Sequence, residues 1–248
     1  MTPWSAKAPF PSSSLAALRN SGLVELRGSS GPRWRDRDAR TLIVVGVPRS
    51  GTTMVATALV RLGVPMGELN EDVYEDLETA AALEQGEVAL LPLIERRNQA
   101  HRVWGFKRPE AFTALDPARI GIFRRPRVLA TFRDPVAIAE RNRISVHQDF
   151  MAGLRRAVRE TRRLVQWLGL LPCPVFVISY EKALGSPEEL IDGLVSFCGL
   201  TPTAEQRAAA IDSVQNGTSA YLDASRIPET PAATGGTCPP VAAESWRP

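Results

Sequence analysis

The stretch "IVVGVPRSGTT", Ile43 to Thr53, decides the fold that the sequence predicts. It continues a β-branched apolar run that begins at Thr41, and such a run is typical of a central parallel strand buried on both faces. A turn that contains glycine follows, and "TMVATALVRLG" (53–63) then predicts a helix. A strand, a tight turn and a helix in this order aim backbone N–H groups at one spot, on the positive end of the helix dipole. We therefore expect an anion to bind at this turn.

The turn departs from the phosphate-binding loop of nucleotide triphosphatases at one position. That loop reads G-x-x-x-x-G-K-[ST], whereas Gly46 to Thr53 reads "GVPRSGTT", so Thr52 stands in the place of the lysine. The lysine neutralises the β- and γ-phosphates, and a separate Asp helps to hold Mg²⁺. Here the cation comes earlier, at Arg49, and no apolar strand ends in a lone Asp. We expect a ligand with less charge at its transferred end than ATP; a turn without a ligand is the alternative.

Strands and helices alternate along the middle of the chain. Further strands are predicted in "RVWGFKRP" (102–109), "PRVLATFRDP" (126–135) and "PVFVISYE" (174–181), with helical segments between them. This alternation predicts a single α/β domain with a mostly parallel sheet. We expect the domain to span 41–223, between an irregular N-terminal arm (1–40) and an irregular C-terminal tail (224–248), because Pro, Ser and Gly punctuate both ends.

The charge of the chain is nearly balanced but unevenly placed. Its 30 basic and 27 acidic residues give a net charge of +3, yet the segment 119–163 holds twelve arginines against four acidic residues. This local excess suggests an anionic ligand or partner. No nucleic-acid-binding motif is present, so we expect no nucleic-acid partner.

Cysteine and histidine spacing gives no indication of a metal site, and we expect none. The three cysteines, Cys173, Cys198 and Cys238, are few and far apart, which favours reduced thiols in a cytoplasmic protein. No run of about 18 apolar residues is present, so no transmembrane helix is predicted.

A second motif, "VLATFRDPVAIAERNRIS" (Val128 to Ser145), is a strand, an Arg-Asp-Pro turn and a helix. Together with "GVPRSGTT" it resembles the sulfotransferases that use PAPS, 3′-phosphoadenosine-5′-phosphosulfate. "VWGFKRP" and "VFVISYEKALGSPEELIDGLVSFCGL" are similar to two further stretches of that family, and "GVPMGELNEDVYEDLE" is similar to an acidic segment of some bacterial members. The similarity covers roughly 41–200. It implies the P-loop-like sulfotransferase fold, which is a three-layer α/β fold with a mostly parallel central sheet and helices on both faces.

The resemblance assigns the donor site to both motifs. The residues implied to surround the 5′-phosphosulfate of PAPS are Pro48, Arg49, Ser50, Gly51, Thr52 and Thr53. Arg133 is implied to bind the 3′-phosphate. The family usually has Ser eight residues after that arginine, and this chain has Arg141. Arginine can also grip a phosphate, and Ser145, one helical turn further, is a possible substitute.

The mechanism that the resemblance implies is in-line attack of an acceptor hydroxyl or amine on the sulfuryl group, without a metal. The acceptor is expected to be a small molecule or a carbohydrate, and the other product is adenosine 3′,5′-bisphosphate. Lys107 and Arg49 are expected to stabilise the reacting group and the departing phosphate. For the general base we favour Glu75, with Glu71 second and Glu110 weaker; Glu68 and Asp76 lie in the same acidic segment. These acids could instead only favour the first turn of a helix.

Two rival functions follow from the same residues. A kinase or other phosphotransferase would need ATP and Mg²⁺, and the missing lysine argues against it. A nucleotide-binding protein of the same fold that has lost catalysis is the other rival, and Arg141 is its best support.

Two helices carry local predictions. Ser186 and Glu189 have the spacing of a capping box at a helix start. In the helix predicted around 154–169, the residues expected to face the core are Leu154, Val158, Thr161, Val165 and Leu168. The arginines between them form either a solvated basic face or a docking surface for an acidic acceptor or the nucleotide.

Overall fold

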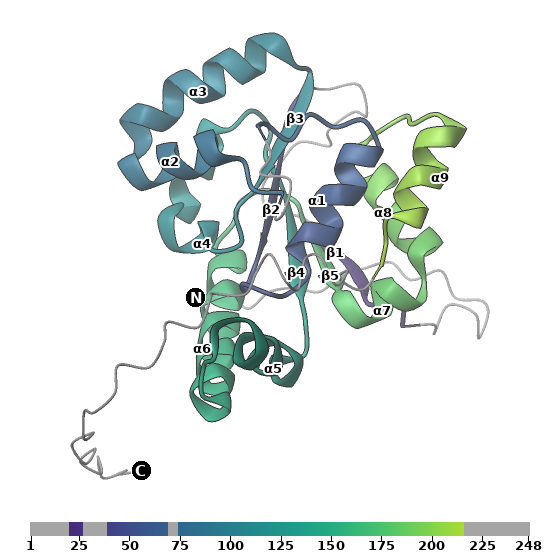
Figure 1. The fold of residues 1–248 in the computed structure, drawn as a ribbon. Helices are drawn as coiled ribbons and strands as arrows, with labels where there is room; N and C mark the ends of the chain where they lie inside the picture. The colour runs from purple at the N-terminus through teal and green to yellow at the C-terminus, as the bar shows by residue number, and fades with distance from the viewer. Residues whose placement is uncertain (1–19, 27–38, 69–73, 216–248) are drawn as a thin grey trace.

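A five-stranded sheet forms the centre of the molecule (Figure 1). The computed structural model describes residues 20–26, 39–68 and 74–215. The strands are β1 (Leu23–Leu26), β2 (Arg40–Gly46), β3 (Val103–Lys107), β4 (Arg127–Phe132) and β5 (Val175–Ser179). They lie in the order β1-β5-β4-β2-β3, and all pairs are parallel except the antiparallel pair of β1 with β5. The predicted α/β fold with a mostly parallel sheet is confirmed.

Strand β2 is the axis of the fold, because all seven of its residues are buried. Successive side chains of a strand point to opposite faces of the sheet, and β2 divides accordingly. Leu42 and Val44 belong to one apolar core, whereas Ile43 and Val45 belong to another. A strand buried on both faces is what its unbroken apolar run predicts.

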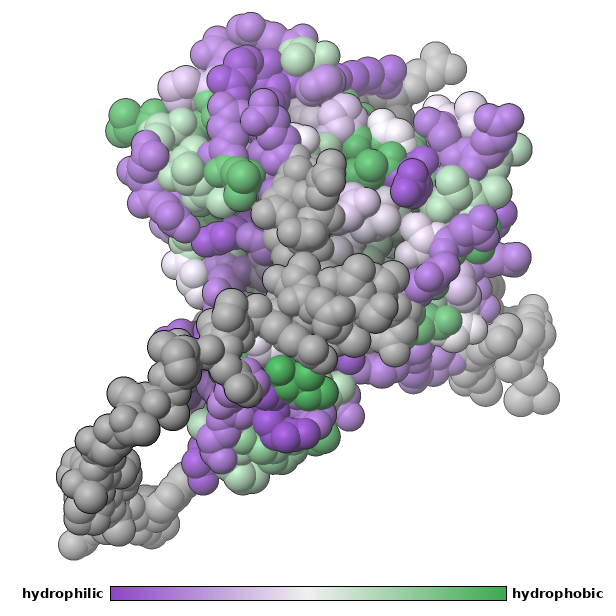
Figure 2. Space-filling view, in the orientation of Figure 1, coloured by the Kyte–Doolittle hydropathy of each residue, from purple (hydrophilic) through white to green (hydrophobic). Residues whose placement is uncertain are grey.

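Helices cover both faces and make the three layers. The first core is closed by α1 (Thr52–Arg61), α7 (Tyr180–Gly185), α8 (Pro187–Cys198) and α9 (Ala204–Asp212). The second core is closed by α2 (Leu77–Gln85), α3 (Glu87–Ala100), α4 (Ala111–Ala114), the 3₁₀ helix η2 (Pro117–Ile122) and α6 (Phe150–Leu168). Helix α5 (Pro135–Val146) packs against α6. Figure 1 shows α1, α8 and α9 on the right of the sheet and α2, α3 and α4 on the left. In Figure 2 the hydrophobic residues of the visible face are scattered among hydrophilic ones, as expected when both cores lie inside.

The crevice between β2 and β4 is the topological switch point of the sheet. From β2 the chain leads to β3 on one side, and from β4 it leads to β5 on the other side. Ligands of open parallel sheets bind outside the carboxyl ends of the strands at such a point. The two motifs found in the sequence, 47–53 and 133–145, follow these two strands directly.

Strand β1 lies in the predicted irregular arm (1–40), where no strand was predicted. Its four residues pair with β5, with Leu23 opposite Ile178 and Leu26 opposite Val175. The sequence predictions also omitted the short elements α4, η2 and α7. Residues 1–19 and 27–38 of the predicted arm and all of the predicted tail lie outside the described residues.

The predicted core stripe of helix α6 is wrong in part. Val158 and Val165 are each 53% exposed, whereas Ala157, Leu164 and Trp167 are buried. Gly153 lies against Ala139 of α5, where an added Cβ would already be in van der Waals contact. A larger aliphatic side chain there would require one of the two helices to shift. The Trp167 indole N–H donates to the Leu115 carbonyl oxygen at 2.7 Å, which fixes the other end.

The predicted capping box at α8 is not formed as expected. Ser186 is the N-cap residue, but its side chain makes no capping hydrogen bond; its backbone angles are φ −144° and ψ 66°. A complete capping box occurs instead at α9, where Thr203 and Gln206 exchange their hydrogen bonds.

Candidate functional site

The loop between β2 and α1 is shaped by backbone conformation. Arg49 and Gly51 both have positive φ, 72° and 95°, and the Ser50 N–H donates to the Val47 carbonyl oxygen at 2.9 Å. Gly51 is the N-cap residue of α1 and supplies no side-chain cap. The first N–H groups of a helix have no partner within the helix, so the loop ends in donors that an anion can use.

Two glycines make this loop possible. A Cβ on Gly46 would lie 2.4 Å from the Ser50 Oγ atom and 2.6 Å from the Thr131 Oγ1 atom. A Cβ on Gly51 would lie 2.1 Å from the Tyr180 ring. The loop is therefore held between β4 and the residue that follows β5.

Two buried hydroxyl groups join the ends of β2 and β4. The Ser50 and Thr131 hydroxyl oxygens are 3.1 Å apart, and Thr131 also donates to the Val45 carbonyl oxygen at 3.3 Å. Both residues are completely buried. Thr131 was not among the predicted site residues, although it comes two residues before Arg133 in the same motif.

The turn after β4 points its arginine toward the first loop. An Arg133 Nη1 group donates to the Arg49 carbonyl oxygen at 3.0 Å, and the guanidinium lies 4.7 Å from the centre of the Tyr180 ring. The Asp134 N–H donates to Glu181 Oε1 at 2.9 Å. The Arg133 Nε atom is buried and has no hydrogen-bond partner among the described residues. Buried polar atoms are normally paired, so this atom is a candidate to bind a ligand.

One face of α5 continues the same site. Ile138, Arg141 and Ser145 recur at helical spacing and are buried, at 1%, 8% and 0% exposure. Ile138 packs with Val47 of the first loop and Ala157 of α6, so this face is directed toward the loop. The Ser145 Oγ atom is buried without a hydrogen-bond partner among the described residues.

Lys107, at the end of β3, supplies a third cation. Its Nζ atom donates to Thr53 Oγ1 at 3.2 Å and lies 3.4 Å from Glu75 Oε1. Burial lowers the pKa of Lys107 to about 8; the charge of Glu75 opposes this shift, and the charges of Arg49 and Arg108 add to it. Lys107 is therefore still mostly protonated at pH 7 but loses its proton well below the usual lysine range.

Glu75 is the acidic residue at this point. Its Oε2 atom accepts from Arg108 Nη1 at 3.0 Å, and the second Nη group of Arg108 donates to Glu84 at 2.9 Å. The Glu75 side chain is 21% exposed, so it keeps access to solvent. Arg108 was missed by the sequence predictions, although it comes directly after Lys107.

Three of the other acidic candidates are among the described residues. Asp76 is buried in an ion pair with Arg97 at 2.7 Å. Glu110 faces Arg156 of α6 at 3.6 Å. The Glu68 carbonyl oxygen accepts from the Leu77 N–H at 3.4 Å. Glu71 lies outside the described residues.

Tyr180 is a central residue that the sequence predictions gave no role. It is buried, at 5% exposure, and contacts both the first loop through Gly51 and the second turn through Arg133. The sequence pattern that could have identified it is "SYEK", directly after the last predicted strand. A residue there should lie near the two turns, because the carboxyl ends of parallel strands meet at one edge of the sheet.

Within the described residues, no group of three or more His, Cys, Asp or Glu side chains is arranged to hold a metal ion. In the same residues, no helix is long and apolar enough to cross a bilayer. Cys173 and Cys198 are buried, and burial raises the pKa of each thiol to about 12. Neither thiol is therefore activated for chemistry, and Cys238 lies outside the described residues.

Known sequences and known structures give different answers. No protein-family model and no curated protein matches the chain. Among solved structures, it is similar to the sulfotransferase domain from the curacin biosynthetic pathway, with 17% identity over 77% of this chain and 84% of that chain, at a TM-score of 0.50. This similarity shows that the chain has the fold of a sulfotransferase, which confirms the predicted fold.

Two mycobacterial enzymes are also similar. Sulfotransferase STF9 from Mycobacterium avium is 16% identical over 70% of this chain and 67% of its own, with a TM-score of 0.47. Sulfotransferase STF1 from Mycobacterium tuberculosis H37Rv is 16% identical over 70% of this chain and 71% of its own, with a TM-score of 0.46.

Proposed function

We propose that this protein is a sulfotransferase that moves the sulfuryl group of PAPS to a hydroxyl or amine of a small molecule or carbohydrate. The observation that carries the proposal is the direct link between the two cationic turns. Arg133 donates to the Arg49 carbonyl oxygen at 3.0 Å, and one buried ring, Tyr180, contacts both turns. Two anion sites at one switch point fit a nucleotide with a phosphate group at each end.

The residues present fit such a donor. The first loop, from Pro48 to Thr53, would bind the 5′-phosphosulfate. The binding groups would be the backbone N–H groups of the loop, including those around Ser50 and Thr52, and the Arg49 side chain. Arg133 would bind the 3′-phosphate, and its buried Nε atom supports this role. Arg141 is the better second ligand of that phosphate, because it lies about 9 Å along the helix axis from the first residue of α5, against about 15 Å for Ser145. Helical side chains also lean toward the N-terminus.

The reaction is a single displacement at sulfur. The acceptor oxygen or nitrogen forms a bond to sulfur, the bond from sulfur to the bridging phosphate oxygen breaks, and the acceptor proton passes to Glu75. The products are the sulfated acceptor and adenosine 3′,5′-bisphosphate. The Lys107 ammonium stabilises the charge that develops on the departing oxygen. Its contact with Thr53, in the first turn of α1, supports this placement.

The rival phosphotransferase fits these residues less well. A loop for ATP needs a lysine where Thr52 stands, and Mg²⁺ needs a carboxylate near the β4 end, where Arg133 precedes Asp134 and Asp134 caps α5. The arginines around the crevice favour a metal-free anion site instead. The cytoplasmic location stays a prediction from the cysteine content.

Thermal stabilisation by nucleotides tests the proposal. Adenosine 3′,5′-bisphosphate should raise the Tm without metal, because a ligand that binds only the folded state stabilises it. ATP with Mg²⁺ should not. A shift with ATP that depends on Mg²⁺ would instead favour the phosphotransferase.

Turnover tests whether the protein is an active enzyme. Incubation with labelled PAPS and an extract of the native cell, followed by mass identification of labelled products, should reveal the acceptor class. Glu75→Gln should reduce this labelling and leave bisphosphate binding intact. Bisphosphate binding without transfer to any acceptor would favour the rival that has lost catalysis.

A further inference from the structure

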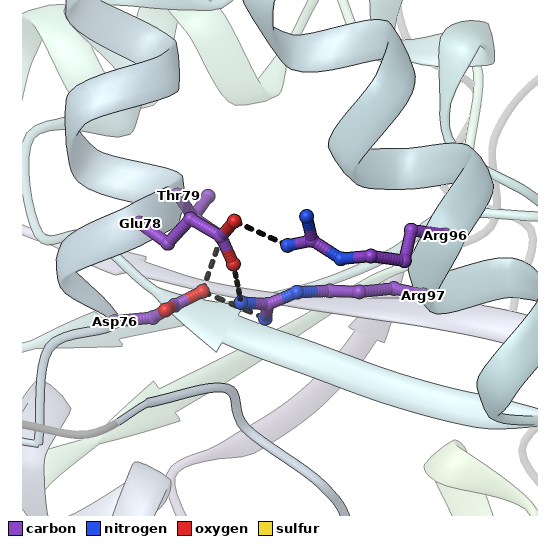
Figure 3. Close-up of polar contacts among 5 residues, drawn as sticks. All are labelled: Asp76, Glu78, Thr79, Arg96 and Arg97. Atoms are coloured by element: carbon purple, nitrogen blue, oxygen red, sulfur yellow. Dashed lines mark hydrogen bonds and ion pairs between the residues drawn. The ribbon is translucent and has the colours of Figure 1, made fainter.

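A closed cluster of ion pairs holds the start of helix α2 against α3 (Figure 3). The Arg97 Nη1 atom lies 2.7 Å from Asp76 Oδ2, and its Nη2 atom donates to Glu78 Oε2 at 3.2 Å. Arg96 pairs with Glu78 from the exposed side. The Asp76 side chain is 0% exposed and that of Arg97 is 10% exposed, whereas that of Arg96 is 61% exposed. The pair of Asp76 and Arg97 is therefore the internal part of the cluster.

The surroundings of this pair leave it little freedom. A Cβ on Gly67 would lie 2.3 Å from Asp76 Cγ and 2.5 Å from Arg97 Nη1, and Gly67 has a φ of +88°. The Arg97 guanidinium lies 5.5 Å from the centre of the Trp104 ring in β3. The pair thus connects the segment after α1, the start of α2, helix α3 and the sheet.

Asp76 makes this ion pair in place of an ordinary helix cap. It is the N-cap residue of α2, where an aspartate usually accepts a backbone N–H of the first turn, yet it makes no side-chain capping bond. Its Oδ2 atom contacts Arg97 and the Thr79 hydroxyl instead. Burying a charged pair carries a large desolvation penalty, and the best-attested use of such pairs is to select one arrangement over its alternatives. The residue whose place depends on this arrangement is Glu75, the next residue back along the chain.

We propose that Asp76 and Arg97 are positioning residues that hold Glu75 against Lys107 and Arg108. The Cα atoms of Glu75 and Asp76 are about 3.8 Å apart, as in any trans peptide, so a fixed Asp76 limits where the Glu75 carboxylate can lie. The Glu75 contacts of 3.4 Å to Lys107 and 3.0 Å to Arg108 follow from this placement. The inference rests on the proposed function only for the role of Glu75 as the base.

The lysine content of the chain offers a test that needs neither donor nor acceptor. The chain has three lysines, Lys7, Lys107 and Lys182, so a protein labelled with ¹³C at lysine Cε gives three signals. Lys7→Arg and Lys182→Arg proteins assign them. The charged groups that face Lys107 are Glu75, Arg49 and Arg108. Of these three, only Glu75 has the opposite charge and raises the pKa of Lys107. If Arg97→Met releases Glu75, Lys107 should titrate below its wild-type value of about 8.

Arg96→Met is the matched control. It removes a neighbouring arginine of the same helix that pairs with Glu78 and leaves the Asp76 pair intact, so the Lys107 titration should stay at its wild-type value. Glu75→Gln sets the largest shift that release of Glu75 can produce. A lower Tm for Arg97→Met together with an unchanged Lys107 titration would mean that the pair only stabilises the fold, and the proposal would be overturned.

Arg97→Lys replaces the methionine variant if the latter does not fold. Lysine keeps the charge but cannot bridge Asp76 and Glu78 with a planar fork. A shift of Lys107 in the same direction supports the proposal, and a titration identical to the wild type overturns it.

A kinetic measurement connects the inference to the reaction. Arg97→Met should lower kcat about tenfold or more and leave the KM for PAPS and bisphosphate binding nearly unchanged, because the pair lies outside the donor turns. An equal loss of bisphosphate binding would contradict a specific effect on Glu75. If the wild-type protein binds no bisphosphate, the proposed function fails, while the titration still decides whether the pair positions Glu75.

Discussion

The two turns at the switch point that we propose to bind anions depend on different kinds of group. The turn after β2, residues 47–51, relies on backbone conformation, with positive φ at Arg49 and Gly51 and a Cβ excluded at Gly46 and Gly51. The turn after β4 relies on the side chain of Arg133, with Arg141 on the following helix. The first turn should therefore fail when a side chain is added, and the second when a side chain is removed.

The largest expected effect is the addition of one methyl group to the first turn. Gly51→Ala places a Cβ at a φ of +95° and 2.1 Å from the Tyr180 ring. Left-handed strain costs about 1–2 kcal/mol and overpacking about 1–3 kcal/mol, so urea unfolding should show a loss of about 2–5 kcal/mol. Left-handed strain alone accounts for about 1–2 kcal/mol. A loss confined to that range would therefore remove the ring contact as a cause.

The second turn should fail on truncation. Arg133→Ala should weaken binding of adenosine 3′,5′-bisphosphate about 100-fold, since loss of one partner of a buried charged hydrogen bond costs about 2–5 kcal/mol. Arg49→Ala should weaken binding of intact PAPS and change bisphosphate binding far less. Calorimetry measures both affinities. If both variants bind like the wild type, the assignment of the two turns is wrong.

The pH dependence should come from neither turn, because arginine does not titrate near neutral pH. Burial lowers the pKa of Lys107 to about 8, so kcat/KM should fall about tenfold per pH unit above that value. Lys107→Met should have low activity and lack this fall. A profile that stays flat to pH 10 would contradict the role of Lys107.

The same group makes a prediction for stability. The pKa of Lys107 is lower in the folded protein than the ordinary lysine value of 10.5, so the unfolded chain binds more protons between about pH 8 and 10.5. The contribution of Lys107 should therefore increase the free energy of unfolding as the pH rises through this window. The difference between wild type and Lys107→Met, measured by urea unfolding at each pH, isolates it.

A smaller effect is expected from the residue that departs from the sulfotransferase pattern. Arg141→Ser should weaken bisphosphate binding roughly tenfold, about 1.4 kcal/mol, because a single neutral hydroxyl replaces a charged guanidinium that can make two hydrogen bonds. Ser145→Ala should change the affinity less. Tighter binding by Arg141→Ser would show that Arg141 opposes the donor, and would strengthen the rival that has lost catalysis.

The smallest effect concerns the hydroxyl contact that joins the turns. Ser50→Ala removes the buried contact with Thr131. This should lower the free energy of unfolding by about 1 kcal/mol, because Thr131 keeps its bond to the Val45 carbonyl oxygen. Ser186→Ala is the control; its side chain makes no capping bond, so a change within about 0.5 kcal/mol is expected. A larger loss at Ser186 would contradict the description of that cap.

Local patterns predicted the parts of the fold that local sequence controls. The apolar run of β2 and the strand-turn-helix motifs gave the central sheet and the two turns, because burial on both faces leaves a clear signal. The orientation of α6 was not accessible in this way. Gly153, Ala157 and Trp167 face inward because of their contacts in the folded protein. Gly153 lies against Ala139 of α5, and Trp167 donates to the Leu115 carbonyl oxygen. A single sequence does not show which residues will meet in this way.

In the candidate site too, local patterns identified some residues and missed others. Residues inside the two motifs were named from the sequence, and their roles stay predictions until a ligand is tested. Thr131, Tyr180 and Arg108 were missed because their importance arises from contacts across long stretches of chain, such as Ser50 with Thr131 and Arg108 with Glu75. Only the order of the strands brings these residues to one edge.

The two edge strands of the sheet, β3 and β1, affect whether the protein associates with itself at high concentration. At the β3 edge, the Gly105 N–H donates to the Pro65 carbonyl oxygen at 2.9 Å, so part of that edge is already covered by the protein's own chain. On the other side, β1 covers β5 with a strand of only four residues that carries Glu25. Short, charged or covered margins discourage strands of neighbouring molecules from joining a sheet. Deleting β1 should therefore promote self-association through the uncovered β5.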